Sequence, residues 1–102
     1  MRTLPIDLPK DAIAEFCRRQ PIARLALFGS VLRDDFGPES DVDFLVELVP
    51  NASVGIFEMT RMQTELSNLL GRKVDLRTPL ELSRHFRDRV LAEADTLYVK
   101  AN

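Results

Sequence analysis

Two aspartates, Asp41 and Asp43, open an apolar segment that ends at Leu48. Because side chains alternate between the faces of a strand, both carboxylates share one face with Leu45, while Phe44 belongs to the apolar face. Their Cβ atoms would lie roughly 7 Å apart, given a rise of about 3.3 Å per residue. This pattern suits a pair of bound cations, because paired metals in phosphoryl-transfer sites lie about 3.5–4 Å apart and are bridged by carboxylates.

A glycine and a serine, Gly29 and Ser30, close the preceding apolar run, which has strand character over residues 22–28. Glycine at the end of a strand lets the backbone approach a ligand closely. Ser30 is suited to cap a short helix over residues 31–33, whose free N–H groups would face an anion. The triphosphate of a nucleotide would fit at this turn.

A third carboxylate, Asp75, lies in a short apolar segment over residues 73–77. If this strand lies beside the one that Asp41 opens, about 4.8 Å away, Asp75 joins Asp41 and Asp43 on the open side of the sheet. The alternative is an exposed aspartate that pairs with Lys73 or Arg77. We favour the first arrangement, in which three carboxylates surround one cavity.

Arg33 has two alternative roles. Arg33 either binds phosphate or pairs with Asp34, Asp35 or the site carboxylates, and we favour a role at the site. His85 is the only histidine, so a zinc site is hard to build from this sequence. Oxygen ligands favour Mg²⁺ or Mn²⁺ instead.

The remaining segments are expected to support this hairpin-like unit as a single domain over residues 1–102. The expected elements are a helix from Pro9 to before Pro21, strands over 22–28 and 41–48, the short helix over 31–33, a helix over 54–70, a strand over 73–77, one or two helices between Pro79 and Ala94, and a strand over 96–99. These elements predict an α/β fold: a small mixed β-sheet with helices on one face and the active site on the other.

Composition excludes several classes of function. The net charge of −2 and pI near 5.4 give no basic field that would hold a nucleic-acid backbone, so direct nucleic-acid binding is not expected. No stretch approaches the roughly 20 apolar residues of a membrane span, and we place the protein in the cytoplasm. Its one cysteine, Cys17, is expected to be a small buried apolar residue.

The spacing of these motifs resembles a known superfamily. The nucleotidyltransferases typified by DNA polymerase β carry Gly-Ser, about ten residues, then Asp-x-Asp, and Gly29-Ser30 with Asp41 and Asp43 have that spacing. The context Leu-Phe-Gly-Ser-x-x-Arg-Asp, followed by Ser-Asp-Val-Asp-Phe-Leu-Val-Glu, is similar to the minimal nucleotidyltransferase (MNT) branch, over nearly the whole chain. The resemblance implies the nucleotidyltransferase fold.

The third acid also matches this branch. Asp75 lies in Val-Asp-Leu-Arg-Thr-Pro, the usual context there, where this acid helps to hold the catalytic metal and draws the proton from the attacking hydroxyl. The departures are mild: Val31-Leu32 stands where Arg-Ala is often found. That difference affects a phosphate contact from position 31 and leaves the metal ligands untouched.

The resemblance implies a function as well. Members of the MNT branch are often antitoxins of HEPN-domain toxins, which are ribonucleases, and transfer AMP to the toxin. By resemblance, ATP would bind with its outer phosphates at Gly29 and Ser30, and Asp41 and Asp43 would bridge two Mg²⁺ ions that Asp75 helps to hold. The acceptor would be a tyrosine or similar hydroxyl of the HEPN toxin, in a hetero-oligomer of the two proteins.

Two other functions are alternatives to AMP transfer to a toxin. An antitoxin that neutralises its partner by binding alone is the main alternative, although a pure binding module has no need of mutually repelling carboxylates on one open face. Transfer of a nucleotide to a small molecule such as an aminoglycoside is disfavoured, because enzymes of that kind usually carry an extra domain that forms the acceptor pocket.

Overall fold

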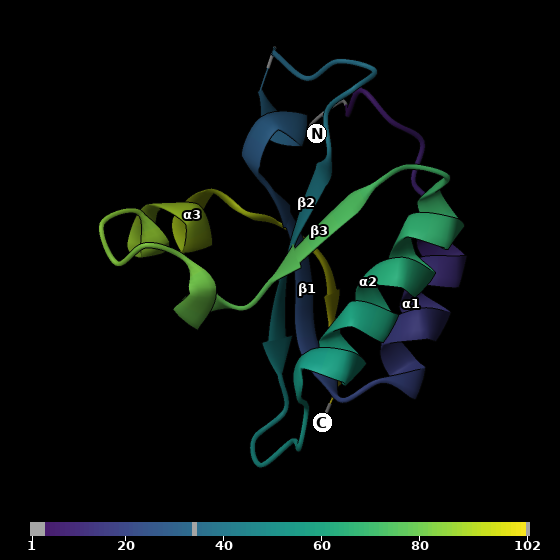
Figure 1. Cartoon of the computed structure of the whole chain (residues 1–102), viewed down its shortest axis with the longest axis vertical. Coiled ribbons are helices and arrows are strands. Elements are labelled where there is room, and N and C mark those ends of the chain that lie inside the picture. The colour runs from purple at the N-terminus through teal and green to yellow at the C-terminus, as the bar shows by residue number, and fades with distance from the viewer. Residues whose placement is uncertain (1–3, 34, 102) are drawn as a thin grey trace.

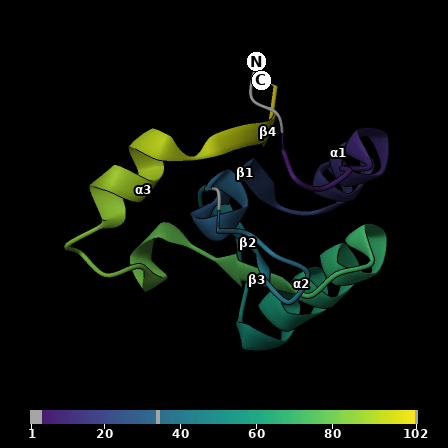
Figure 2. The same ribbon diagram turned by 90° about the horizontal axis from the view of Figure 1, so that it is seen from above.

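Two long helices pack on one face of a four-stranded sheet, and a third, shorter helix lies on the opposite side (Figure 1, Figure 2). The computed structural model describes residues 4–33 and 35–101, so Asp34 lies outside the described residues. Its elements in chain order are α1 Lys10–Arg19, β1 Ile22–Phe28, the 3₁₀ turn η1 Gly29–Leu32, β2 Val42–Leu48, α2 Ile56–Leu70, β3 Val74–Arg77, the 3₁₀ turn η2 Pro79–Glu81, α3 Arg87–Glu93 and β4 Asp95–Val99. The predicted α/β fold with a small mixed sheet is confirmed.

The strands follow the order β3-β2-β1-β4. β1 runs antiparallel to both β2 and β4, whereas β3 runs parallel to β2. Asp43 is the register partner of Phe28 on one side and of Asp75 on the other. Phe28, Asp43 and Asp75 therefore lie in one row across the sheet.

The core lies between the sheet and helices α1 and α2. Apolar residues recur at helical spacing on α1, which buries Ile13, Phe16 and Cys17, and α2 buries Met62 and Leu66. Full burial of a large apolar side chain stabilises a fold by about 1.5–3 kcal/mol, so this layer supplies much of the free energy that holds the sheet rigid. The strands add Leu25, Leu27, Val42, Phe44, Val46, Val74 and Leu76 to the core.

Cys17 is buried as predicted. Burial raises the pKa of its thiol to about 11, and the charge of Arg18 opposes this shift. The thiolate is the reactive form of cysteine, so this residue is chemically quiet at neutral pH.

The position of α3 differs from the predicted arrangement of all helices on one face. β3 and β4 lie at opposite edges of the sheet, so the chain between them must cross one of its faces. α1 and α2 already cover one face, and η2 and α3 therefore cross the other (Figure 2). Leu45, on the face of Asp43, is consequently buried rather than open, beside Ala26 of β1.

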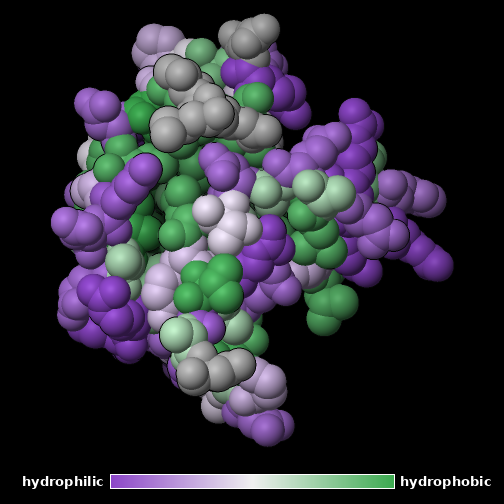
Figure 3. All heavy atoms as spheres, turned by 180° about the vertical axis from the view of Figure 1, so that it is seen from behind, coloured by the Kyte–Doolittle hydropathy of each residue, from purple (hydrophilic) through white to green (hydrophobic). Residues whose placement is uncertain are grey.

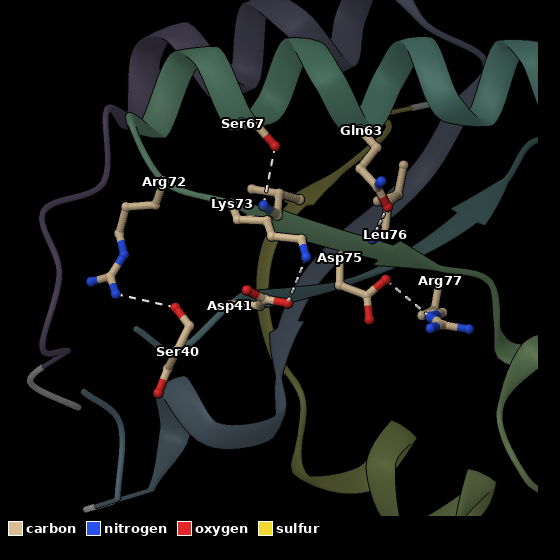
Figure 4. Close-up of polar contacts among 10 residues, drawn as sticks. Ser40, Asp41, Gln63, Ser67, Arg72, Lys73, Asp75, Leu76 and Arg77 are labelled. Carbon is tan, nitrogen blue, oxygen red and sulfur yellow. Dashed lines mark hydrogen bonds and ion pairs between the residues drawn. The ribbon is translucent and has the colours of Figure 1, made fainter. Parts of the chain in front are cut away.

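The outer edge of β3 is closed by side chains of α2. The Val74 N–H donates to Ser67 Oγ at 3.1 Å, and the Leu76 N–H donates to Gln63 Oε1 at 2.9 Å (Figure 4). An edge strand otherwise presents unpaired backbone groups to other chains. These two bonds also fix β3, and with it Asp75, against α2.

We expect Gln63→Ala to lower the free energy of unfolding by about 1 kcal/mol, because the backbone donor of the nearly buried Leu76 loses its acceptor. Chemical denaturation measures the change. Thr64→Ala, at the exposed neighbouring position on the same helix, serves as the control and should leave the stability unchanged or slightly higher. Equal stability of the two variants would contradict the role given to Gln63.

The surface of the described residues is mixed in character. Seen from behind, hydrophobic side chains are interspersed with hydrophilic ones, which dominate the outline (Figure 3). Within the described ranges, the exposed large hydrophobic residues are Ile56, Phe57, Leu80, Phe86 and Val99. None of the helices among the described residues has the length and apolar character needed to span a membrane.

Candidate active site

The fold brings the predicted glycine and two of the predicted aspartates to one end of the sheet. β1 ends at Phe28, and Gly29 follows it directly beside Asp43 of β2. Asp75 occupies the matching position on β3. β2 and β3 are neighbours, as was assumed for Asp75, and the structure shows that they pair in parallel, which places Asp75 beside Asp43.

Gly29 has a backbone conformation and a neighbour that both require glycine. Its φ is +78°, in the left-handed region that L side chains rarely adopt. A Cβ atom added here would also overlap the carboxylate oxygen Oδ2 of Asp43. The missing side chain therefore makes room for the catalytic carboxylate predicted here, in addition to any close approach of a ligand.

The surroundings of Asp43 shift the pKa of its carboxyl. Burial raises the pKa of its carboxyl, and the charges of Asp75 and Asp41 raise it further, while Arg77 and Arg33 act in the opposite direction. The net effect is a rise, so the nearby arginines do not fully compensate the negative charge. An added cation would relieve this repulsion.

The other two acids pair with basic residues of the β3 segment (Figure 4). Arg77 Nε donates to Asp75 Oδ1 at 3.1 Å, and Lys73 Nζ lies 3.8 Å from Asp41 Oδ2. Asp75 thus shares one feature with each predicted alternative: it lies beside Asp43, and it pairs with Arg77 while being only partly exposed.

These pairs bear on metal binding. Within residues 4–33 and 35–101, no group of three or more His, Cys, Asp or Glu side chains is arranged to hold a metal ion. Asp41 and Asp75 turn toward their basic partners instead of converging on Asp43. The donor set still fits Mg²⁺, because it consists of carboxylate oxygens around an uncompensated negative charge.

Ser30 does not cap a helix as predicted. η1 begins at Gly29, its N-cap position is Phe28, and it has no side-chain capping bond. The left-handed glycine already starts the turn, so Ser30 lies inside it. Ser30 directly follows Gly29, the glycine that contacts Asp43, so its hydroxyl lies at the same end of the sheet.

Arg33 lies at the wall of a hollow next to Gly29. Its Nε atom donates to Asp35 Oδ1 at 3.3 Å, and both side chains are largely exposed, at 64% and 71%. An exposed pair of this kind is worth at most about 1 kcal/mol, so the guanidinium is available to another anion. The hollow has a volume of about 490 Å³ and is lined by Phe28, Gly29, Leu32, Arg33, Leu82, Phe86, Arg89, Val90 and Glu93.

Two features near the site could not be predicted from local sequence patterns: the wall of this hollow that α3 forms, and Arg72. The α3 wall depends on the crossing of the chain from β3 to β4, which no local pattern encodes. Arg72 contacts the chain before Asp41 through backbone carbonyls, a long-range contact without a sequence signature.

A mixed sheet with this helix layer, and with paired aspartates beside a left-handed glycine at its end, is the architecture of a nucleotidyltransferase domain. The family model for the nucleotidyltransferase domain matches residues 10–97, and the chain belongs to this family. The predicted resemblance and the predicted class of enzyme, a nucleotidyltransferase, are confirmed.

Curated relatives come from the archaeon Methanocaldococcus jannaschii. The chain is 32% identical over 85 residues to MJ0435, a provisionally assigned protein adenylyltransferase, covering 83% of this chain and 89% of the relative. It is 33% identical over 78 residues to MJ1379, with the same provisional name, covering 76% and 77% of the two chains.

Solved structures agree with the fold. A provisionally assigned minimal nucleotidyltransferase superposes with a TM-score of 0.69 at 32% identity, over 83% of this chain and 85% of that one. A toxin-antitoxin crystal structure with AMP-PNP gives a TM-score of 0.73 at 20% identity, over 91% and 75% of the two chains. An MNT antitoxin in complex with the tri-AMPylated HEPN toxin of Shewanella oneidensis gives 0.64 at 19% identity, over 89% and 70%.

Proposed function

We propose that this chain transfers AMP from ATP to a hydroxyl group of a partner HEPN toxin and thereby acts as the antitoxin of a toxin-antitoxin pair. The observation that carries the proposal is the placement of Asp43 between Gly29 and Asp75. The names of the curated relatives support protein adenylylation, and the toxin-antitoxin complexes among the structural neighbours support the partner.

In this proposal, Asp41, Asp43 and Asp75 hold Mg²⁺. The bound metal supplies positive charge against the entering and leaving oxygens of the transferred phosphoryl group. Asp41 and Asp75 reach this arrangement when their carboxylates leave Lys73 and Arg77. Both of these ion pairs are partly exposed, so breaking them costs little free energy.

Asp75 is the residue to which we assign the proton transfer. The acceptor hydroxyl oxygen forms a bond to the α-phosphorus of ATP, and the bond from that phosphorus to the bridging oxygen of the β-phosphate breaks. The hydroxyl proton passes to Asp75, and pyrophosphate leaves.

The outer phosphates of ATP are assigned to Gly29, Ser30 and Arg33. Gly29 exposes its backbone at the end of β1, Ser30 adds a hydroxyl donor, and Arg33 lies along the wall of the adjoining hollow. A guanidinium matches the geometry of phosphate oxygens in two-pronged hydrogen bonds. Arg33 would exchange its pairing with Asp35 for the phosphate.

We expect Arg33→Ala to raise the KM for ATP by about tenfold with a smaller effect on kcat, because the lost contact is made equally before and during the reaction. Its melting temperature should remain close to that of the wild type, since the pair with Asp35 is exposed. Steady-state kinetics and thermal unfolding measure both. An unchanged KM would remove Arg33 from the nucleotide site.

Exposed apolar residues near β3 support a protein as the acceptor. Ile56 lines a shallow depression together with Asp75 and Arg77. Ile56, Phe57 and Leu80 are each at least three-quarters exposed, at 76%, 80% and 83%. Of these three residues, Ile56 lines the same depression as the carboxylate that would receive the proton of the acceptor, so a protein surface that covers Ile56 would also lie over Asp75.

The test begins with a search of the flanking genes for a HEPN protein and measures transfer of AMP from α-labelled ATP with Mg²⁺ to that protein, with Asp75→Asn as the matched variant. Label on the HEPN protein that is lost in the variant is the expected result. If no label appears while the two proteins bind and the toxin is silenced, the chain is an antitoxin that acts by binding alone.

A further inference from the structure

Arg72 contacts residues 36–40, the segment that precedes Asp41. Its Nη2 atom lies 2.9 Å from the Gly37 carbonyl oxygen and 3.1 Å from that of Pro38. It also lies 3.1 Å from the Ser40 carbonyl oxygen (Figure 4). The same guanidinium lies over the ring of Phe36, with its central carbon 4.6 Å from the ring centroid. One side chain thus contacts four residues of the connection between η1 and β2.

The backbone of Arg72 is itself held firmly. α2 ends at Gly71, which adopts the left-handed conformation with a φ of +67°. The Arg72 N–H then donates to the Ser67 carbonyl at 3.3 Å, a bond that commonly closes such a helix end. The guanidinium is therefore carried by a rigid part of the fold.

Among the described residues, the segment that Arg72 contacts is otherwise held by its own turn, by Phe36, which packs against the core, and by the start of β2. Its turn is closed internally, since the Gly37 N–H donates to Ser40 Oγ and the Ser40 N–H donates to the Gly37 carbonyl, each at 3.0 Å. After Ser40 the chain passes through Asp41, and the Val42 N–H donates to the Lys73 carbonyl at 2.9 Å. The internal turn shapes the segment, whereas Arg72 ties it to the connection between α2 and β3.

We propose that Arg72 is a positioning residue, which holds residues 36–40 against the α2–β3 connection and thereby places Asp41 beside Asp43 and Asp75. The inference rests on the proposed function of these acids. It follows from the connectivity: Asp41 precedes β2, so its position depends on the turn before it, and Arg72 fixes that turn to the strand that carries Asp75.

The neighbouring Lys73 acts on the same residue. Its ammonium lies 3.8 Å from Asp41 Oδ2, so the dipeptide Arg72-Lys73 holds both the backbone before Asp41 and its carboxylate. Lys73 is largely exposed, at 80%, whereas the Arg72 contacts to Gly37 and Ser40 are partly buried. Arg72 is therefore expected to supply most of the positional restraint.

The test compares Arg72→Ala and Arg72→Lys with the wild type, and uses Arg18→Ala as the control. Arg18 forms an exposed pair with Glu15 on α1, so Arg18→Ala also removes one guanidinium and is a matched control. Hydrogen exchange of residues 36–41, the Mg²⁺ concentration needed to raise the melting temperature, and AMP transfer to the HEPN protein are measured for each variant.

For Arg72→Ala we expect faster exchange confined to residues 36–41, a higher Mg²⁺ requirement and a kcat lower by about 10²-fold, because a displacement of about 1 Å at a catalytic group has that effect. Arg72→Lys should restore part of each property, since its ammonium keeps donors for the carbonyls but loses the planar contact with Phe36. Arg18→Ala should leave all three unchanged.

Two results would overturn the inference. The first is unchanged exchange of residues 36–41 in Arg72→Ala. The second is exchange that rises equally through α2 and β3, which would make Arg72 a general structural residue. If the wild-type protein transfers no AMP, the proposed function fails, whereas the exchange and Mg²⁺ measurements still decide the role of Arg72.

Discussion

Asp43→Asn is expected to abolish AMP transfer and at the same time to raise the melting temperature of the metal-free protein. Transfer should fall by at least about 10³-fold, because the charge that holds the metal contributes several kcal/mol to the transition state. The fold should gain stability, because the half-buried carboxylate is repelled by Asp75 and Asp41. A neutral amide of the same shape removes that repulsion.

The size of this stability gain depends on pH. The pKa of Asp43 is raised in the folded protein above its ordinary value of 3.8, so the folded state holds the proton more tightly than the unfolded state. The wild type therefore loses stability as the pH rises from the ordinary value through the raised one. The Asp43→Asn variant has no carboxyl at this position and does not lose this stability. It should therefore be more stable than the wild type at pH 7, and the difference should vanish in acid.

Thermal unfolding between pH 3 and pH 8, with and without Mg²⁺, measures these effects. At pH 7 we expect a gain of a few degrees for Asp43→Asn, on the order of 1 kcal/mol for a domain of this size. Mg²⁺ should raise the melting temperature of the wild type but not that of the variant, because a ligand stabilises only the state that binds it.

Asp11→Asn is the control for the loss of one negative charge. Asp11 lies in the first turn of α1, where a carboxylate is favourable, so its removal should leave the stability unchanged or slightly lower. A loss of stability in Asp43→Asn equal to that in Asp11→Asn would show that Asp43 is not under electrostatic strain. Retained AMP transfer would remove Asp43 from the site.

The sheet could be predicted from the sequence because its strands follow simple local rules. The alternation from Asp41 to Leu48 fixes which side chains share a face, and the same parity in Lys73–Arg77 places Asp75 with them once the two strands are neighbours. The neighbour relation itself was an assumption, and the structure confirms it. The choice of Asp41, Asp43 and Asp75 as metal ligands stays a prediction.

The features that the sequence did not predict depend on contacts between distant segments. The capping role given to Ser30 is wrong because the 3₁₀ turn already begins at Gly29, which takes a left-handed conformation and places Ser30 inside the turn. The crossing of η2 and α3 over the site follows from the place of β4 beside β1, which no segment encodes alone. Arg72 gave no local signal, because its partners are backbone carbonyls of another loop.

Gly29→Ala is expected to impair both stability and transfer. The left-handed φ of +78° costs an alanine about 1–3 kcal/mol. The added methyl group would also overlap Asp43 Oδ2, so the carboxylate must move away from its place next to Asp75. We expect transfer to fall by about 10²-fold or more, since the displaced atom belongs to the proposed metal ligand.

Gly71→Ala separates these two effects. Gly71 has a similar φ of +67°, but a Cβ atom added there meets no atom within 4 Å. Both variants should lose stability through backbone strain, as measured by chemical denaturation, whereas only Gly29→Ala should lose most of its AMP transfer at temperatures where both are folded. Equal transfer by the two variants would mean that the contact between Gly29 and Asp43 does not serve catalysis. A selective loss in Gly29→Ala would identify the glycine as the residue that gives the Asp43 carboxylate its place in the site.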